Sequence, residues 1–333
     1  MQTTLADNYQ QQVYTNDVEN NLRRCVHCGF CNATCPTFQL LGDELDGPRG
    51  RIYLIKQILE GAADPTPSSR KHLDRCLTCQ SCETTCPSGV KYSRLLEVGR
   101  QLHQETLSRP LNEKWTRILL RKIILRPMLF KFLLSAAHTS SFLLPKSIKK
   151  NIPPLGKIAN TESKNELASA KPAGDVNKKR TLIMLRGCAQ QVCAPDINHS
   201  ASALFDQIGF TVIESLTDHC CGALSHHNDA SEEARYLARK NIDNWWPEIE
   251  RGAEAIVVTA SGCATMVQEY GHLLADDPDY ADKASRVAEL CCDPVEVLEA
   301  FSGQLKTRAS IEDRISYQAP CSQQHGLGIK GRV

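Results

Sequence analysis

The chain changes its hydrophobic pattern near its middle. Before residue 110, short helical patterns alternate with dense cysteines; in RIYLIKQILE, for example, Ile52, Ile55 and Leu59 fall on one helical face. After residue 180, short β-branched runs (TLIML, TVIESL, AIVVTAS and ISYQA) alternate with amphipathic segments and lead into cysteine-bearing loops. The sequence therefore predicts an α-helical domain followed by an α/β domain with a parallel sheet.

Two segments of different composition separate these regions. Residues 114–160 contain ten Lys or Arg and no acidic residue, and the next stretch is rich in Pro, Ala, Ser and Lys with little apolar periodicity. The predicted domains are a helical domain over residues 1–110, a basic helical arm over 111–150, an exposed linker over 151–180 and the α/β domain over 181–333.

The composition of the chain indicates metal binding because of its many cysteines. The 333 residues include 39 basic and 38 acidic side chains, for a net charge of +1, so the total charge gives no reason to expect a nucleic-acid partner. Sixteen cysteines are many for a chain too long to be a disulfide-stapled module. The start, MQTTLADNYQQQ, lacks the basic and apolar regions of a signal peptide. We therefore expect reduced, metal-binding thiols in a cytoplasmic protein.

The strongest motif is CVHCGFCNATCP at residues 25–36, repeated as CLTCQSCETTCP at 76–87. Both fit C-x2-C-x2-C-x3-C-P, in which three thiolates of one loop hold an iron–sulfur cubane and the fourth ligates the other cluster. Paired C-x-x-C units also occur in zinc sites, but zinc does not require this triple spacing followed by C-P. The predicted ligands are Cys25, Cys28, Cys31 and Cys86 for [4Fe-4S] cluster 1, and Cys76, Cys79, Cys82 and Cys35 for [4Fe-4S] cluster 2. Gly29 lets the first loop pass close to its cluster, whereas Gln80 at the matching position predicts different tuning of the second.

A second set of cysteines follows the predicted strands of the α/β domain. The candidate ligands of a third iron–sulfur centre are Cys188, Cys220, Cys221, Cys263 and Cys321. The pattern resembles the cysteine-rich CCG domain of heterodisulfide-reductase-like electron-transfer proteins. It departs from that pattern at Met266, where a cysteine would complete a C-x-x-C motif with Cys263. PCSQQ at residues 320–324 resembles GCAQQ at 187–191 and so indicates the start of a second repeat, but no CCG follows it. The sequence leaves open whether these thiols bind a cluster or are structural.

The remaining candidates are weaker. Cys291 and Cys292 fall in a helical pattern and are expected to be packed, and Cys193 is a lone thiol. The histidines that flank the CCG loop are candidates for binding metal or a redox partner, although solvated loop histidines are commoner. These histidines are His219, His226 and His227. GLGIKG at residues 326–331 has the spacing of a dinucleotide fingerprint but not the following helix that this fingerprint requires.

The basic segment at residues 115–145 is too interrupted to span a bilayer. Its longest uncharged run, at residues 132–145, is shorter than the roughly 20 residues needed, and Pro127 breaks the preceding run. Its mixture of bulky apolar and basic residues suits the surface of an anionic membrane, but it also suits an arm that docks on another protein or on the helical domain.

The two motifs, together with CCGALSHH and VVTASGCA, make the chain resemble the iron-sulfur subunits of bacterial glycolate oxidase. The resemblance implies an α-helical ferredoxin-like 2[4Fe-4S] domain followed by an α/β cysteine-rich CCG domain, with the second repeat truncated at the C-terminus. It also implies FAD-binding partner subunits that oxidise glycolate to glyoxylate. This chain would have no catalytic residues and would relay single electrons toward the membrane quinone pool or another acceptor.

Other interpretations of the same motifs remain open. Within the class, the chain could serve a glycerol-3-phosphate or lactate dehydrogenase complex. Outside it, the chain could be a cluster-bearing redox scaffold without a dehydrogenase partner. Because two cluster motifs occur with no nucleophile constellation beside them, the sequence favours electron transfer as one part of a larger enzyme.

Overall fold

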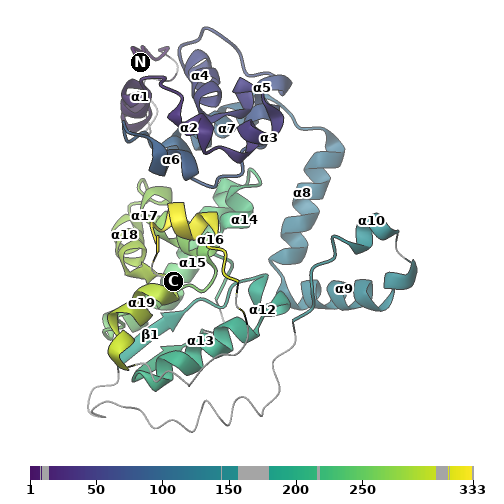
Figure 1. The fold of residues 1–333 in the computed structure, drawn as a ribbon, viewed down its shortest axis with the longest axis vertical. Coiled ribbons are helices and arrows are strands. Elements are labelled where there is room, and N and C mark those ends of the chain that lie inside the picture. The colour runs from purple at the N-terminus through teal and green to yellow at the C-terminus, as the bar shows by residue number, and fades with distance from the viewer. Residues whose placement is uncertain are drawn as a thin grey trace. The chain divides into compact units, whose positions relative to one another are not determined.

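The computed structural model describes residues 1–7, 9, 15–143, 145–156, 180–215, 218–304, 314 and 316–331. The chain divides into two compact units (Figure 1). Unit 1 comprises Met1–Lys114 and Ala319–Lys330, and unit 2 comprises Trp115–Gln318 and Gly331–Val333. Most of the predicted linker, residues 157–179, lies outside the described residues.

Unit 1 is helical. Its elements are α1 (Thr15–Arg24), α2 (Phe30–Ala33), α3 (Pro36–Leu41), the 3-10 turn η1 (Glu44–Asp46), α4 (Pro48–Leu59), α5 (Pro67–Asp74), α6 (Ser81–Thr85), α7 (Tyr92–Thr106) and the π-helical turn η4 (Ser322–Gly326). Prolines occupy the first turn of α3, α4 and α5, where a missing N–H costs no helical hydrogen bond. The proline of the first C-P pair therefore starts a helix immediately after Cys35.

The core of unit 1 forms where α1, α4, α5 and α7 meet. Ile52, Ile55 and Leu59 are all buried, which confirms the apolar face that the sequence predicts for α4. They pack with Leu22 of α1 and Leu95 of α7, and cysteines of both loops border the same core. The cysteine loops are thus supported by a rigid apolar layer.

Unit 2 contains a four-stranded parallel sheet in the order β2-β1-β3-β4. The strands are β1 (Arg180–Met184), β2 (Phe210–Ile213), β3 (Ala255–Val257) and β4 (Cys291–Cys292). The helices are α12 (Gln190–Cys193), α13 (Asp196–Gln207), α14 (Ala223–His226), α15 (Ser231–Glu250), α16 (Ser261–Gln268), α17 (Tyr270–Leu273), α18 (Ala281–Leu290) and α19 (Pro294–Ala300), followed by the 3-10 turn η3 (Ser302–Gln304). The predicted α/β class with a parallel sheet is confirmed.

Helices cover both faces of the sheet. On one face, Leu182 and Met184 of β1 pack with Phe205 of α13 and Val297 of α19. Ile183 points to the opposite face, because side chains alternate along a strand, and it is also buried. In a parallel sheet that is covered on both faces, ligands usually bind at the edge formed by the carboxyl ends of the strands.

The fourth strand differs from the sequence prediction. Residues 316–319 of ISYQA form no strand, and Ile315 lies outside the described residues. The edge strand is instead Cys291–Cys292, which the helical pattern around it concealed. A strand of two residues is too short for alternation to be visible, and α18 and α19 flank it directly.

The basic segment forms two helices, α8 (Leu111–Ile124) and α9 (Pro127–Thr139), followed by the 3-10 turn η2 (Ser141–Leu143) and α10 (Lys146–Lys149). Pro127 begins α9 at its first turn and so separates the two helices. Arg117 and Arg121 of α8 form ion pairs with Asp229 and Glu233, at 3.1 and 2.9 Å. Among the described residues, no helix combines the length and the apolar character needed to cross a bilayer.

Candidate iron–sulfur sites

The two cysteine loops share one backbone conformation. His27 and Gly29 of the first loop have φ of 58° and 85°, and Thr78 and Gln80 of the second have φ of 52° and 57°. Alternation of left-handed residues turns successive N–H groups toward one point, which makes a concavity for an anion. Gln80 therefore adopts the same left-handed conformation as Gly29, and the tuning difference predicted from this position does not arise from the backbone.

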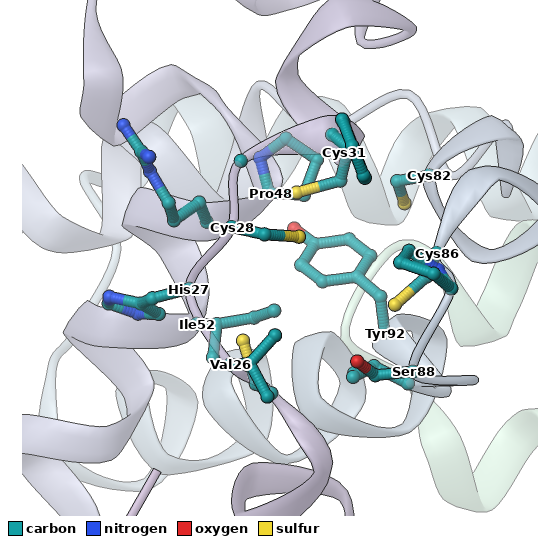
Figure 2. Close-up of a pocket in the computed structure, with 16 residues that line it drawn as sticks. Val26, His27, Cys28, Cys31, Pro48, Ile52, Cys82, Cys86, Ser88 and Tyr92 are labelled. Atoms are coloured by element: carbon teal, nitrogen blue, oxygen red, sulfur yellow. The ribbon is translucent and has the colours of Figure 1, made fainter.

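The first thiol group consists of Cys25, Cys28, Cys31 and Cys86. All four line one pocket, together with Cys82 and Tyr92. Figure 2 shows the side chains of Cys28, Cys31, Cys82 and Cys86 around this space, with the Tyr92 ring among them. The structure thus brings the last cysteine of the second motif to the three leading cysteines of the first.

The second thiol group consists of Cys35, Cys76, Cys79 and Cys82. The charges of Cys76 and Cys35 both act on Cys79, and those of Cys76 and Cys79 act on Cys82. The last cysteine of the first motif therefore lies near the leading cysteines of the second. This reciprocal arrangement is the geometry that the crossed ligand assignment requires, and ligation itself stays a prediction.

The thiols of both groups are held close together in partly dry surroundings. Burial, with the nearby charges of Cys25, Cys86 and Cys28, raises the pKa of Cys31 to about 11. Burial also raises the pKa of Cys25 and Cys79, although the N–H groups of His27 and Ser81 donate to these sulfurs and oppose the shift. Burial and, to a smaller extent, repulsion between neighbouring thiolates therefore keep these thiols neutral in the absence of a cation, and a bound metal would favour the thiolate form.

A buried tyrosine supports the same interpretation. Tyr92 is 5% exposed, and its hydroxyl has no hydrogen-bond partner of good geometry among the described residues. The hydroxyl nevertheless lies beside Cys76, whose charge acts on it. A buried donor without a partner is costly, and a sulfur ligand next to it would supply the missing acceptor. The donor set and this orphaned hydroxyl fit an iron–sulfur cluster.

The third thiol group lies at the carboxyl edge of the sheet in unit 2. Cys188 follows β1, Cys220 and Cys221 follow β2, and Cys263 follows β3. The sulfurs of Cys188 and Cys220 are 3.2 Å apart, and the Cys221 thiol forms hydrogen bonds with both Cys220 and Cys263. Hydrogen bonds from Cys188 and Cys221 lower the pKa of Cys220 and so favour its thiolate. Four convergent sulfurs form a donor set that suits zinc or iron–sulfur chemistry.

Two side chains that sequence reasoning missed hold the CCG loop. Asn241 of α15 accepts from the His219 N–H at 2.9 Å and donates to the Cys220 carbonyl at 3.0 Å. The Tyr270 hydroxyl donates to the Cys221 carbonyl at 2.9 Å and accepts from Asn241 at 3.1 Å. Both side chains are fully buried. Each is a residue with a polar group at a buried position of a helix, and that is the only feature of the sequence that could have indicated its role.

The other candidate cysteines each have their own surroundings. Cys321 belongs to unit 1, where it is exposed and its charge acts on Cys79, whereas the four thiols of the third group belong to unit 2. Cys291 is buried in β4 with its thiol against the Ala264 carbonyl, as expected for a packed thiol. Cys193 ends α12 beside the loop that contains Gly156.

The histidines and the glycine-rich run are also placed. His226 ends α14, and its ring lies 5.5 Å from that of His227. The backbone N–H of His219 is one of the groups that fix the CCG loop. In the glycine-rich run, η4 ends at Gly326, and residues 327–331 form no helix.

Comparison with known families defines the class of protein. Residues 21–90 match the 4Fe-4S dicluster domain family, and residues 183–268 match the family described as a cysteine-rich domain. The first match contains the first and second thiol groups, and the second contains the third. The chain is therefore an iron–sulfur protein with a dicluster domain and a separate cysteine-rich domain.

Relatives define the family more closely. The chain is 45% identical over 334 aligned residues to the glycolate oxidase iron-sulfur subunit of Escherichia coli, covering 100% of this chain and 79% of the relative. It is 28% identical to the probable glycolate oxidase iron-sulfur subunit of Bacillus subtilis, covering 91% and 71%. Lactate utilization protein A of Bacillus subtilis is 22% identical, covering 43% and 58%. No solved structure matches. The chain belongs to the family of glycolate oxidase iron-sulfur subunits.

Proposed function

We propose that this chain is the electron-transfer subunit of a complex that oxidises glycolate to glyoxylate. The observation that carries the proposal is the interleaving of two four-thiol groups in unit 1, in a chain that is 45% identical to a glycolate oxidase iron-sulfur subunit. In this assignment the first thiol group holds [4Fe-4S] cluster 1 and the second holds [4Fe-4S] cluster 2. When bound, such clusters supply one-electron carriers.

The residues of the chain have supporting roles at these sites. The cysteines anchor the metal, the left-handed loop residues aim backbone N–H groups at it, and the apolar core of unit 1 limits the access of water. The third thiol group is assigned to a further iron–sulfur centre, for which Cys321 stays a candidate ligand. Its four sulfurs converge, and Asn241 and Tyr270 fix the loop that bears two of them.

We assign the oxidation of the substrate to partner subunits. Glycolate gives up two electrons and two protons to become glyoxylate, and a flavin accepts such a pair as a hydride and a proton. This assignment needs an FAD-binding partner upstream and a one-electron acceptor, such as the membrane quinone pool, downstream. The three thiol groups contribute sulfur ligands, which suit one-electron carriers and support a conducting role for this chain.

We also propose that the complex sits on the cytoplasmic face of the membrane through the basic arm, α8 and α9. Exposed apolar side chains on these helices include Trp115, Leu119, Met128 and Phe132, at 59% to 83%. Lys122, Arg126 and Lys131 are exposed among them, whereas Arg117 and Arg121 are paired within unit 2. Exposed basic and apolar residues along the same two helices suit an anionic lipid headgroup layer.

Glycolate should reduce the clusters only in the presence of the flavoprotein. We expect anaerobic glycolate to bleach the visible iron–sulfur absorption of the co-purified complex and to leave that of the isolated chain unchanged. Lactate and glycerol 3-phosphate, tested in parallel, check the choice of hydroxy substrate. Oxidation of glycolate by the isolated chain would contradict the division of roles, and faster reduction by lactate would shift the assignment to a lactate-oxidising complex.

Cys35→Ala should damage cluster 2, although Cys35 lies in the first motif. The reciprocal variant, Cys86→Ala, should damage cluster 1. The measurement is electron paramagnetic resonance of the dithionite-reduced protein, with signals assigned by Cys79→Ser and Cys28→Ser. If each substitution affects the cluster of its own motif, the crossed assignment is wrong.

Cys188→Ser should remove metal from unit 2 and leave both clusters of unit 1 in place. Wild-type protein should contain about twelve iron atoms if the third centre is a cubane, against about eight for unit 1 alone. The matched control is Cys193→Ser, which should leave the iron content unchanged. Iron and zinc are quantified together, since zinc lost from Cys188→Ser would make the third centre a zinc site.

The arm should bind anionic vesicles in a salt-dependent way. We expect the protein to float with phosphatidylglycerol-containing liposomes at low salt and to be released at high salt, because screening weakens surface attraction. Lys122→Glu combined with Arg126→Glu should abolish flotation. The control variant, Lys71→Glu combined with Lys240→Glu, changes the net charge by the same amount outside the arm and should preserve flotation. Equal loss from both double variants would show that net charge, and not the arm, is responsible.

A further inference from the structure

The fourth cysteine of the first motif lies against a buried polar network. Cys35 is 6% exposed, and its sulfur is 3.2 Å from the hydroxyl of Thr37. The Thr37 hydroxyl also accepts from Nη2 of Arg51 at 3.2 Å and donates to the Asp46 carbonyl at 2.8 Å. Thr37 therefore connects a thiol of the second group to a guanidinium.

Arg51 is a buried cation whose negative partner is shared. Its side chain is 1% exposed, and Nε donates to the His72 carbonyl at 2.7 Å. The Asp46 carboxylate lies 3.6 Å from Nη2 of Arg51, but it also contacts Arg75 at 2.6 Å and His72 at 3.0 Å. Asp46 is shared with Arg75 and His72, so it only partly neutralises Arg51; Arg75 is 37% exposed and the nearby Asp43 carboxylate is also exposed. The guanidinium of Arg51 lies within electrostatic reach of both Cys35 and Cys76.

The first thiol group has different surroundings at the equivalent place. Ser88 stands two residues after Cys86, as Thr37 stands two residues after Cys35, but Ser88 is half-buried and no hydrogen bond to a basic side chain is found for it within the described part of the chain. Arg49 acts on Cys28 and Cys31 of this group. Its side chain is 36% exposed and is paired with Glu44 at 2.6 Å, so its charge is both neutralised and screened.

We infer that Thr37, held by Arg51, donates to the Cys35 sulfur when that sulfur is a ligand, and thereby makes the second thiol group the higher-potential site of unit 1. Reduction adds one negative charge, which a donor and a buried cation stabilise. The Thr37 hydroxyl has a single hydrogen, which it donates to the Asp46 carbonyl, while Arg51 occupies one of its lone pairs. A ligand thiolate at Cys35 has no hydrogen of its own, so it competes with that carbonyl for the hydroxyl hydrogen across a sulfur–oxygen distance of 3.2 Å. Thr37 is thus a positioning residue, and the inference rests on the proposed ligation.

The test is a redox titration of the full-length, cluster-loaded chain followed by electron paramagnetic resonance. In the wild type, the midpoint potential of cluster 2 should be the higher of the two. Thr37→Val keeps the side-chain shape and removes the hydroxyl; it should lower the reduced-to-oxidised ratio of cluster 2 about tenfold at a fixed potential, equivalent to about 59 mV for one electron. Cluster 1 should titrate as before, and Thr37→Ser should restore the wild-type value.

Ser88→Ala is the matched control and should leave the potential of cluster 2 unchanged. A wild-type chain in which cluster 2 has the lower potential overturns the inference whatever the variants do, as does a Thr37→Val protein with full iron content and unshifted potentials. If Thr37→Val loses iron, the inference is still tested by which cluster of the wild type has the higher midpoint potential and by the potential of cluster 2 in Thr37→Ser. A chain that holds no iron at all contradicts the proposed function instead, so the two failures are distinguishable.

Discussion

Thiolates repel one another, and unit 1 places eight cysteines in two short loops. Burial is the largest cause that raises the pKa of several of these thiols, and repulsion from neighbouring thiolates adds to it, so the loops in isolation favour neutral sulfur. A bound metal reverses the preference, because its positive charge makes the thiolate the stable form. The backbone contributes to the same end through left-handed residues that turn N–H groups inward. The two cysteine loops of unit 1 therefore combine thiols that burial keeps neutral with backbone N–H groups that favour a bound anion.

The two cysteine loops share one backbone conformation, but the segments that surround them differ. His27 and Thr78, like Gly29 and Gln80, adopt matching left-handed conformations, so the geometry around the two thiol groups is nearly duplicated. The segments after the two C-P pairs differ: Pro36 begins α3 and brings Thr37 under η1 and α4, whereas Ser88 lies in a half-buried turn. An electron carrier with two like sites needs some such difference if one site is to be preferred, and here it comes from the supporting helices.

The sequence predicted features that depend on local spacing and missed those that depend on tertiary packing. The cysteine spacing identified the dicluster domain, and β-branched runs identified β1, β2 and β3. The strand Cys291–Cys292 was missed because two residues carry no periodicity, and ISYQA was wrongly predicted as a strand because a β-branched run need not pair. The charge of Arg51 suggests a helix-surface residue, yet its side chain is buried at 1% exposure because Asp46 and the His72 carbonyl lie beside it. No pattern along one helix reveals partners supplied by other elements.

Unit 2 assembles its thiols by a different principle. The third thiol group does not come from one tight loop of closely spaced cysteines; the parallel sheet brings together residues separated by up to 75 positions, from Cys188 to Cys263, because β1, β2 and β3 end at one edge. Such a site depends on the sheet remaining intact, with local reinforcement from Asn241 and Tyr270 on the CCG loop. Loop-based sites tolerate change in distant parts of a domain, whereas an edge-based site transmits any shift between strands to its ligands. The arrangement of the sulfurs in the third thiol group therefore depends most on the packing of its whole domain.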